Sequence, residues 1–258
     1  MKNLFDKYEE NGFVVLENAI PSEIVDKYLR LYENEHGDSV EGWGRDEKYA
    51  DYQEIRDILC HPTIAKAFDG IEISAALHIE MTMQKSTECC WHKDSLLQDK
   101  YAASTYIGAF VCLEDIDADS GPFEVIPGSH KWDHLIPLLT REKVETGQDG
   151  EQYMEDLLLA EAEKLGADIF TFLGKKGDVL LWHSQLAHRG AQANGRQRRK
   201  TIIGHYCGNY SHEYHHGPLP EFNKWKSEML SSGAYSQHGD DGTLYFNKVD
   251  WSNLSPAQ

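Results

Sequence analysis

Two histidines and one aspartate occupy positions from which they could share a metal ion. His92 and Asp94 are separated by one residue, and His188 follows Asp94 by 94 residues. Side chains two apart on an extended segment point to the same side, so His92 and Asp94 can face one ion together. Two imidazoles and one carboxylate leave coordination positions open, which suits non-haem Fe(II) that must bind oxygen and a co-substrate. The pattern therefore predicts an iron centre formed by these three residues.

A co-substrate such as 2-oxoglutarate has a second carboxylate far from the metal, and this group needs a fixed cation inside the protein. Arginine suits the task because it is always charged and can donate two parallel hydrogen bonds. Candidates stand in the stretch 194–200, Asn-Gly-Arg-Gln-Arg-Arg-Lys, just before a predicted strand. Basic residues after a turn are also commonly solvated, so the sequence leaves both interpretations open.

Several other residues could be mistaken for metal ligands. His183 lies on the predicted strand that leads to His188, but the spacing to the arginine stretch favours His188. We expect His130 to be structural, with its ring bonded across a turn. A cluster in the tail has metal-like spacing, and we interpret it as surface or rim histidines: His212, His215 and His216.

Two cysteines and two tryptophans stand beside the motifs. Cys89 and Cys90 precede His92 and could form a soft metal site, but adjacent residues rarely reach one metal, so we interpret them as thiols lining a strand or loop. Trp91 and Trp182 are expected to belong to the core or to a pocket wall.

The secondary structure that must position these residues changes character along the chain. The first 70 residues read as mostly helical, with helices expected at 4–10, 21–35 and 52–68 and a strand at 13–16. The third helix is broken at His61-Pro62. From 77 to 84 apolar and polar residues alternate, which predicts a half-buried strand. Turns rich in Gly and Pro separate further predicted strands at 105–113, 123–126, 178–182 and 200–207.

Many short strands with such turns predict a mainly β protein with flanking helices, built on a double-stranded β-helix (a cupin-like jelly roll). We expect a single domain over 1–258, with a helical part at 1–70, the jelly roll at 71–207 and an irregular tail at 208–258. In a jelly roll, His92 and Asp94 would end one strand and His188 would lie near the end of a later one. A polar, helix-prone insertion at 136–165 is either a lid that excludes water or a surface excursion.

Composition limits the partners and the location. The chain has 258 residues, 40% of them hydrophobic, so a globular fold is expected. A formal charge of -18 disfavours nucleic acid and anionic membranes, and no apolar run is long enough to span a bilayer. The five cysteines are odd in number and form no Cys-x-x-Cys pair, which indicates a reduced, cytoplasmic protein. We expect a small-molecule substrate; the sequence carries no information on oligomeric state.

Taken together, the motifs resemble the phytanoyl-CoA dioxygenase family of Fe(II)/2-oxoglutarate-dependent oxygenases. The matching blocks lie in family order and cover most of the chain between residues 11 and 207. They are Asn-Gly-Phe-Val-Val-Leu at 11–16, Trp-His-Lys-Asp at 91–94, Ser-Gly-Pro-Phe-Glu-Val-Ile-Pro-Gly-Ser-His at 120–130, and the stretch 177–199 that opens with Gly-Asp-Val-Leu-Leu-Trp-His. The block at 120–130 is the most specific.

This resemblance implies a role for each matching residue. The three predicted ligands, His92, Asp94 and His188, would bind Fe(II), with 2-oxoglutarate and O2 as co-substrates. Arg199, eleven positions after the distal histidine, would hold the far carboxylate of 2-oxoglutarate. Lys85 falls near a lysine that often helps to bind 2-oxoglutarate in the family. Phe110 stands where a tryptophan commonly packs on the co-substrate.

The chain departs from the family pattern after the distal histidine. Gly190 stands where the family often has serine, and Asn194 follows His188 by six positions where the family's asparagine follows by five. This shift of one residue leaves Arg198 as a competitor to Arg199 for the co-substrate.

The resemblance implies hydroxylation of an unactivated C–H bond in a small metabolite or natural-product intermediate, with release of succinate and CO2. Asp94 disfavours halogenation, because halogenating relatives replace this carboxylate with a small residue. Desaturation, ring closure and epoxidation stay open. Two alternatives also stay open: a cupin-type iron oxygenase that does not use 2-oxoglutarate, and a jelly-roll binding protein without catalytic activity.

Overall fold

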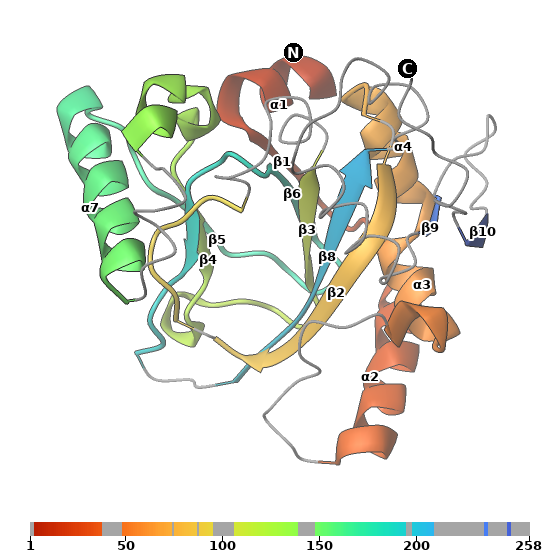
Figure 1. Cartoon of the computed structure of the whole chain (residues 1–258). Helices are drawn as coiled ribbons and strands as arrows, with labels where there is room; N and C mark the ends of the chain where they lie inside the picture. The colour runs from red at the N-terminus through yellow and green to blue at the C-terminus, as the bar shows by residue number, and fades with distance from the viewer. Residues whose placement is uncertain are drawn as a thin grey trace.

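The computed structural model consists of two antiparallel sheets with helices on their outer sides (Figure 1). It describes residues 3–37, 48–73, 75–86, 88–94, 106–138, 148–194, 198–208, 235–236 and 247–248. The larger sheet has the strand order β1 (Phe13–Leu16), β6 (Val179–His183), β3 (Ile107–Cys112), β8 (Arg198–Gly208), β2 (Ala75–Lys85), β9 (Tyr235–Ser236) and β10 (Asn247–Lys248). The smaller sheet has the order β5 (Phe170–Phe172), β4 (Phe123–Val125) and β7 (His188–Gly190).

Helices before and between the strands complete the described part of the chain. The α-helices are α1 (Leu4–Asn11), α2 (Ser22–His36), α3 (Gln53–Leu59), α4 (Pro62–Gly70) and α7 (Gln148–Leu165). The short 3-10 helices are η1 (Lys48–Ala50), η2 (Ala118–Ser120), η3 (Ser129–Lys131) and η4 (Asp133–Leu138). Local chemistry sets the ends of α1: Asn3 and Asp6 form a capping box, and Gly12 ends the helix in the left-handed conformation with φ of 78°.

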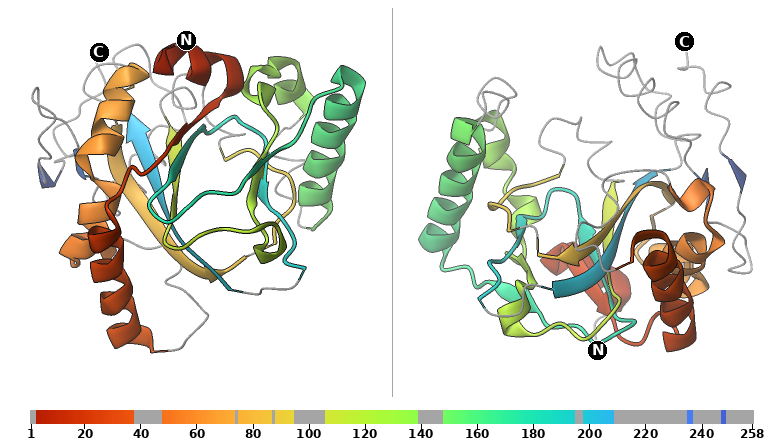
Figure 2. Two further views of the ribbon diagram at one scale, coloured as in Figure 1. Left: turned by 180° about the vertical axis from the view of Figure 1, so that it is seen from behind. Right: turned by 90° about the horizontal axis from the view of Figure 1, so that it is seen from below.

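The larger sheet separates two apolar cores. Helices α2, α3 and α4 cover its outer face, as the views from the front and from behind both show (Figures 1 and 2). The helix-side core between them includes Tyr28, Ile55, Phe68, Ile107 and Tyr206. The inter-sheet core fills the space between the two sheets and includes Phe110, Phe123, Phe172, Leu180 and Trp182. Alternation along each strand directs neighbouring residues into different cores.

A third core lies behind the smaller sheet. Helix α7 stands on the opposite side of the molecule from α2 (Figure 2) and packs Met154 and Leu158 against Trp91, Ile126 and Ala187. We call this cluster the outer core. Because Trp91 directly precedes His92, helix α7 packs against the segment that carries the predicted metal ligands.

Most elements predicted from the sequence are present, and the architecture is the expected jelly roll. The helix predicted to open at Pro21 begins at Ser22, with Pro21 as its N-cap, and the break at His61-Pro62 separates α3 from α4. Strands β5 and β7, which have three residues each, were not predicted from the sequence. His188 consequently begins a strand of its own instead of lying near the end of the strand that starts at Val179. His92 and Asp94 likewise follow β2 by several residues rather than ending it.

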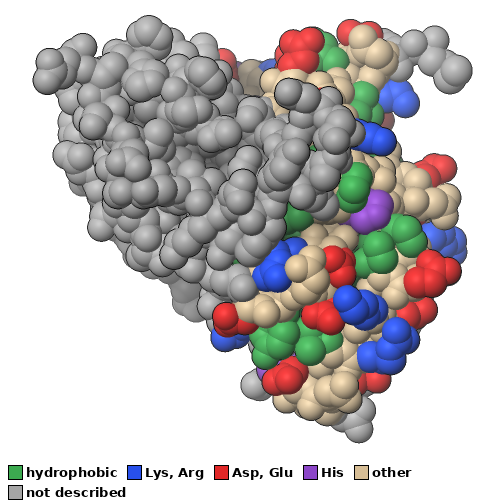
Figure 3. All heavy atoms as spheres, turned by 90° about the vertical axis from the view of Figure 1, so that its right-hand side faces the viewer, with side chains coloured by type: hydrophobic (Ala, Val, Ile, Leu, Met, Phe, Trp, Pro, Cys, Tyr) green, Lys and Arg blue, Asp and Glu red, His purple; other side chains and the backbone are tan. Residues whose placement is uncertain are grey.

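The side of the molecule on which α2 and α3 lie carries acidic and basic side chains that are interspersed (Figure 3). Lys27 of α2, for example, lies 3.2 Å from Asp57 and 3.4 Å from Glu54 of α3. Within the described ranges, no helix is both long enough and apolar enough to cross a membrane.

The turn before β6 provides a test of the fold. Gly177 has φ of +87°, and a Cβ placed there would lie 2.2 Å from the carbonyl oxygen of Ile20. We expect Gly177→Ala to lower the free energy of unfolding by about 2–3 kcal/mol, measured by urea denaturation. Gly166→Ala is the matched control, because Gly166 also has positive φ (+62°) but has no atom within 4 Å of its added Cβ. Equal losses in both variants would contradict the importance of the Ile20 contact.

Candidate active site

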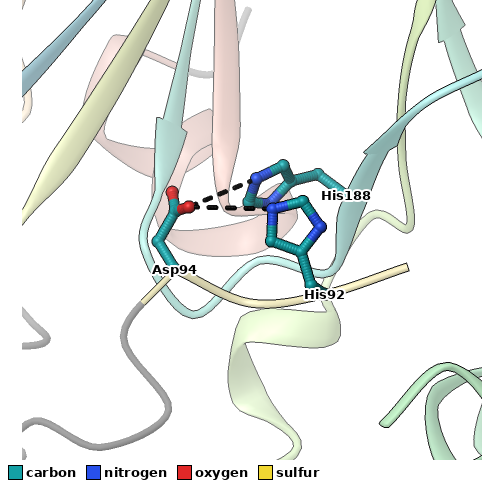
Figure 4. Close-up of side chains that lie close together, drawn as sticks. All are labelled: His92, Asp94 and His188. Carbon is teal, nitrogen blue, oxygen red and sulfur yellow. Dashed lines mark ion pairs between the residues drawn. The ribbon is translucent and has the colours of Figure 1, made fainter. Parts of the chain in front are cut away.

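His92, Asp94 and His188 lie together at one end of the inter-sheet core (Figure 4). Their nearest ligand atoms all lie within 4.8 Å of one another, and this triad could bind a metal ion such as iron. Asp94 Oδ1 lies 3.9 Å from His92 Nε2 and 3.5 Å from His188 Nε2. Both imidazoles therefore present the same nitrogen to the same carboxylate oxygen.

Backbone carbonyls fix the orientation of both imidazoles. His92 Nδ1 lies 2.9 Å from the carbonyl oxygen of Cys90, and His188 Nδ1 lies 2.8 Å from that of Leu186. A ring that donates from Nδ1 carries its lone pair on Nε2, which is the tautomer a metal ligand needs. The two rings thus have the same tautomer, set by the residue two positions earlier in each case.

Reciprocal backbone hydrogen bonds join the two ligand segments. The amide of His92 donates to the carbonyl of His188, and the amide of His188 donates to the carbonyl of His92, both at 3.0 Å. Ser129 adds a second connection, because its hydroxyl accepts from the amide of Ala187 at 2.8 Å and its carbonyl accepts from Lys93 Nζ at 2.9 Å. Ser129 is fully buried, and Lys93 is nearly so. Ser129 of the Pro-Gly-Ser-His turn therefore holds both ligand segments.

The electrostatics of the triad favour a charged carboxylate. Burial alone would raise the pKa of Asp94, but the charge of His188 and its hydrogen bond, with His205 and His92 nearby, hold that pKa well below its usual range. Burial likewise opposes protonation of His92, whereas its hydrogen bond to Cys89 and the Asp94 charge raise its pKa to about 9. The ionised carboxylate of Asp94 attracts a divalent cation, which displaces the proton from an imidazole that it binds.

Arg199 projects from β8 into the inter-sheet core. It is 1% exposed, and its guanidinium carbon lies 5.3 Å from the centroid of the Phe110 ring. Burial lowers its pKa to about 10, so it is a cation at neutral pH. One guanidinium nitrogen donates to the carbonyl of Gly121, but Nε has no hydrogen-bond partner among the described residues. The hydroxyl of Thr201, two residues along the same face of β8, also lacks a partner there.

Not every predicted site residue joins this group. Lys85 ends β2 opposite Arg198, and its side chain is exposed. The side chain of Arg198 lies outside the described residues, as do the tail histidines His212, His215 and His216. Cys89 and Cys90 are free thiols, and the Cys89 sulfur accepts a hydrogen bond from the amide of Gly190.

His183 lies apart from the triad, as the sequence analysis expected. Its ring is on the opposite side of β6 from Trp182 and faces Tyr8 and His130, with ring centroids 6.1 Å and 5.3 Å away. The expected structural role of His130 agrees with a hydrogen bond from Nε2 to the carbonyl of Glu9 that ties the turn to α1. The structure thus brings His188, and not His183, to His92 and Asp94.

Three residues around the triad were not identified from the sequence. Trp182 Nε1 donates to Asp94 Oδ2 at 2.9 Å, although the tryptophan was expected only to pack. His205 stacks on Tyr106 at 5.5 Å and packs edge-on against Trp182 at 5.6 Å. Ser129 was recognised only as part of a turn. Strand alternation would have placed His205 with Arg199 and Thr201, but the partners of Trp182 and Ser129 depend on tertiary packing.

A cavity of about 700 Å³ lies beside the smaller sheet, and none of the three triad residues lines it. Its wall includes Glu124 and Arg189, whose side chains pair at 2.8 Å on the face of that sheet opposite the inter-sheet core. The triad therefore lies outside this cavity, although Cys89 and Cys90, which precede His92, line it.

Comparisons with known proteins agree with this geometry. A family model described as phytanoyl-CoA dioxygenase (PhyH) matches residues 8–201. No curated protein matches the sequence closely enough to count as a relative.

Three similar solved structures share the fold at low sequence identity. The non-heme alpha ketoglutarate dependent epimerase SnoN from nogalamycin biosynthesis has a TM-score of 0.60 and 18% identity, over 80% of this chain and 82% of SnoN. The carbocyclase SnoK from the same biosynthesis has a TM-score of 0.57 and 16% identity, over 98% and 90%. EctD from S. alaskensis with bound Fe has a TM-score of 0.60 and 17% identity, over 79% and 75%.

The half-buried pair of His130 and His183 predicts that acid destabilises the protein. Burial, with the positive charges of His130 and Lys93, lowers the pKa of His183 to about 3, and burial lowers that of His130 to about 4. In the unfolded chain both pKa values are about 6.5, so the unfolded state binds more protons below that pH. We expect the unfolding free energy to be maintained above about pH 6.5 and to fall between pH 6.5 and 4.

A variant that lacks the imidazole of His183 tests this prediction. His183→Asn keeps an acceptor for the amide of Gln185, which bonds His183 Nδ1 at 3.0 Å, but removes the titrating ring. Urea denaturation from pH 7.5 to 4.5 should show a shallower pH dependence for the variant than for the natural protein. If the unfolding free energies of both proteins fall equally with pH, His183 does not contribute to the acid destabilisation.

Proposed function

Because the chain belongs to the phytanoyl-CoA dioxygenase family, we propose that it is a single-domain, Fe(II)- and 2-oxoglutarate-dependent dioxygenase that hydroxylates a small molecule. The observation that carries the proposal is the convergence of two imidazole nitrogens on one oxygen of Asp94, at an inter-sheet core that also holds a buried arginine with an unused donor.

The triad fits Fe(II) by its donor set. His92 and His188 offer Nε2 atoms already oriented by their backbone partners, and Asp94 offers an anionic oxygen. Three protein ligands on one side of an ion leave positions open for a chelating co-substrate and for oxygen. In this reading, the three residues act only as ligands.

Arg199 fits the far carboxylate of 2-oxoglutarate. Its unpartnered Nε is a buried donor that a carboxylate would satisfy, and a buried charge of this kind is costly without such a partner. Phe110 would form an apolar wall beside it, and the Thr201 hydroxyl would supply a second hydrogen bond to the same carboxylate. Lys85 is a weaker candidate because its side chain is exposed.

When bound, iron and 2-oxoglutarate would together supply the oxidising chemistry, in which O2, 2-oxoglutarate and R–H become R–OH, succinate and CO2. One oxygen atom enters the product hydroxyl, and the other enters the new carboxylate of succinate. The chain's own contribution is to orient the ligands, anchor the co-substrate and surround both with the apolar inter-sheet core.

Hydroxylation is the outcome we propose, because Asp94 occupies the position that halogenation would need vacant. SnoN and SnoK are named an epimerase and a carbocyclase, so epimerisation and ring closure are the outcomes to test beside it.

A formal charge of -18 leads us to propose a small polar or cationic substrate, or a natural-product intermediate, and neither nucleic acid nor a membrane as partner. Free thiols at Cys60, Cys89, Cys90 and Cys112 support a cytoplasmic location.

Removing the ligand carboxylate tests the function. We expect Asp94→Ala to reduce succinate formation from 2-oxoglutarate by at least about 100-fold and to weaken Fe(II) binding by about 10- to 100-fold. Asp115→Ala is the control, because Asp115 pairs with Lys175 at the surface. Oxygen consumption that persists without 2-oxoglutarate would favour the cupin-type alternative, and absence of metal binding by the natural protein would favour the non-catalytic one.

Two neighbouring arginines give a separate test of the co-substrate site. Arg199→Gln should raise the KM for 2-oxoglutarate by about 10- to 100-fold, since a charge-assisted pair contributes roughly 1.5–3 kcal/mol. Arg198→Gln should leave this KM within about twofold. If the effect follows Arg198 instead, that residue takes the role assigned to Arg199.

A further inference from the structure

The two oxygens of Asp94 have different surroundings. Oδ1 faces the Nε2 atoms of His92 and His188, where a shared ion would lie. Oδ2 instead accepts a hydrogen bond from Trp182 Nε1 at 2.9 Å. An oxygen that accepts an indole N–H has one lone pair committed and is turned away from the position that both imidazoles share (Figure 4).

The indole has little freedom to move from this position. Trp182 is 1% exposed, and its ring packs against Phe123 at 5.0 Å and against His188 at 5.4 Å. Trp182 pairs with Gly108 across β6 and β3, and a Cβ at Gly108 would lie 2.1 Å from an indole carbon. The ring therefore lies directly over the glycine. Because Gly108 has no Cβ, the indole can occupy this place, from which Nε1 reaches Asp94.

We propose that Trp182 is a positioning residue that restricts Asp94 to coordination through Oδ1 alone, and that Gly108 is required for this arrangement. This inference rests on the proposed function, since it concerns how the triad holds its metal. A carboxylate with two free oxygens can chelate an ion through both. Chelation by both oxygens of Asp94 would occupy one more coordination position on the metal. The co-substrate 2-oxoglutarate and oxygen need all the coordination positions that the triad leaves open.

The test uses Co(II) in place of iron, because the visible absorption of Co(II) reports its coordination number without turnover. Trp182→Phe keeps an aromatic ring but removes the N–H donor. We expect it to change the Co(II) spectrum before 2-oxoglutarate is added and to raise the Kd of the Co(II)-loaded protein for 2-oxoglutarate by about 10-fold. Gly108→Ala should shift both readouts in the same direction, because its Cβ displaces the indole.

Trp132→Phe is the matched control. Trp132 is a buried tryptophan of the outer core, so its loss should lower the melting temperature without changing the Co(II) spectrum. The inference is overturned if Trp182→Phe is folded, binds Co(II) and gives the spectrum and 2-oxoglutarate affinity of the natural protein. Failure of the natural protein itself to bind Co(II) and 2-oxoglutarate would instead overturn the proposed function. If Gly108→Ala does not fold, the comparison of Trp182→Phe with Trp132→Phe is sufficient to test the role of Trp182.

Discussion

The candidate site depends on a pair of backbone hydrogen bonds between His92 and His188. This bridge brings together two segments almost a hundred residues apart, and it does so at the two residues whose side chains must meet. A bridge places directly opposed side chains on the same side of a sheet, so the imidazoles are brought together by main-chain geometry. Ser129 reinforces the junction from the buried side through Ala187 and Lys93. The specificity of the Pro-Gly-Ser-His block thus has a physical basis in the support of both ligand segments.

The inter-sheet core combines this junction with polar groups that an apolar core would normally exclude. Arg199, Thr201 and His205 all project from one face of β8 into a space otherwise lined by aromatic and aliphatic side chains. Burial of an arginine whose Nε has no partner lowers folding stability, because the group loses water without a full replacement. Such a cost is typical of sites where a ligand completes the hydrogen bonding. The unpartnered Nε therefore indicates that a ligand binds Arg199, and in the proposed function this ligand is the far carboxylate of 2-oxoglutarate.

Much of the fold and of the site could be predicted from the sequence because the signals are local. Alternation identified β2, the Asn-Gly pair marked the end of α1, and the motifs around His92, Asp94 and His188 identified the triad. Strands of three residues, such as β5 and β7, carry too little periodicity to be found, so the position of His188 in its strand was wrong.

Non-local contacts account for what the sequence did not reveal. Trp182 looks like any core tryptophan until β3 places Gly108 beneath its ring and Asp94 within reach of its nitrogen. Exposure of Lys85 at the end of β2 is likewise a property of the assembled sheet, and so is the packing of α7 behind the metal segment.

The larger sheet has one further consequence, which concerns how this protein can change over evolution. Successive residues of β8 belong to different cores: Ile203 faces the metal side, whereas Ile202 and Tyr206 face the helices, where the Tyr206 hydroxyl donates to the carbonyl of Leu59. Substitutions in the helical layer can therefore change stability at positions that do not face the triad, whereas substitutions on the opposite face of the same strand act on the inter-sheet core.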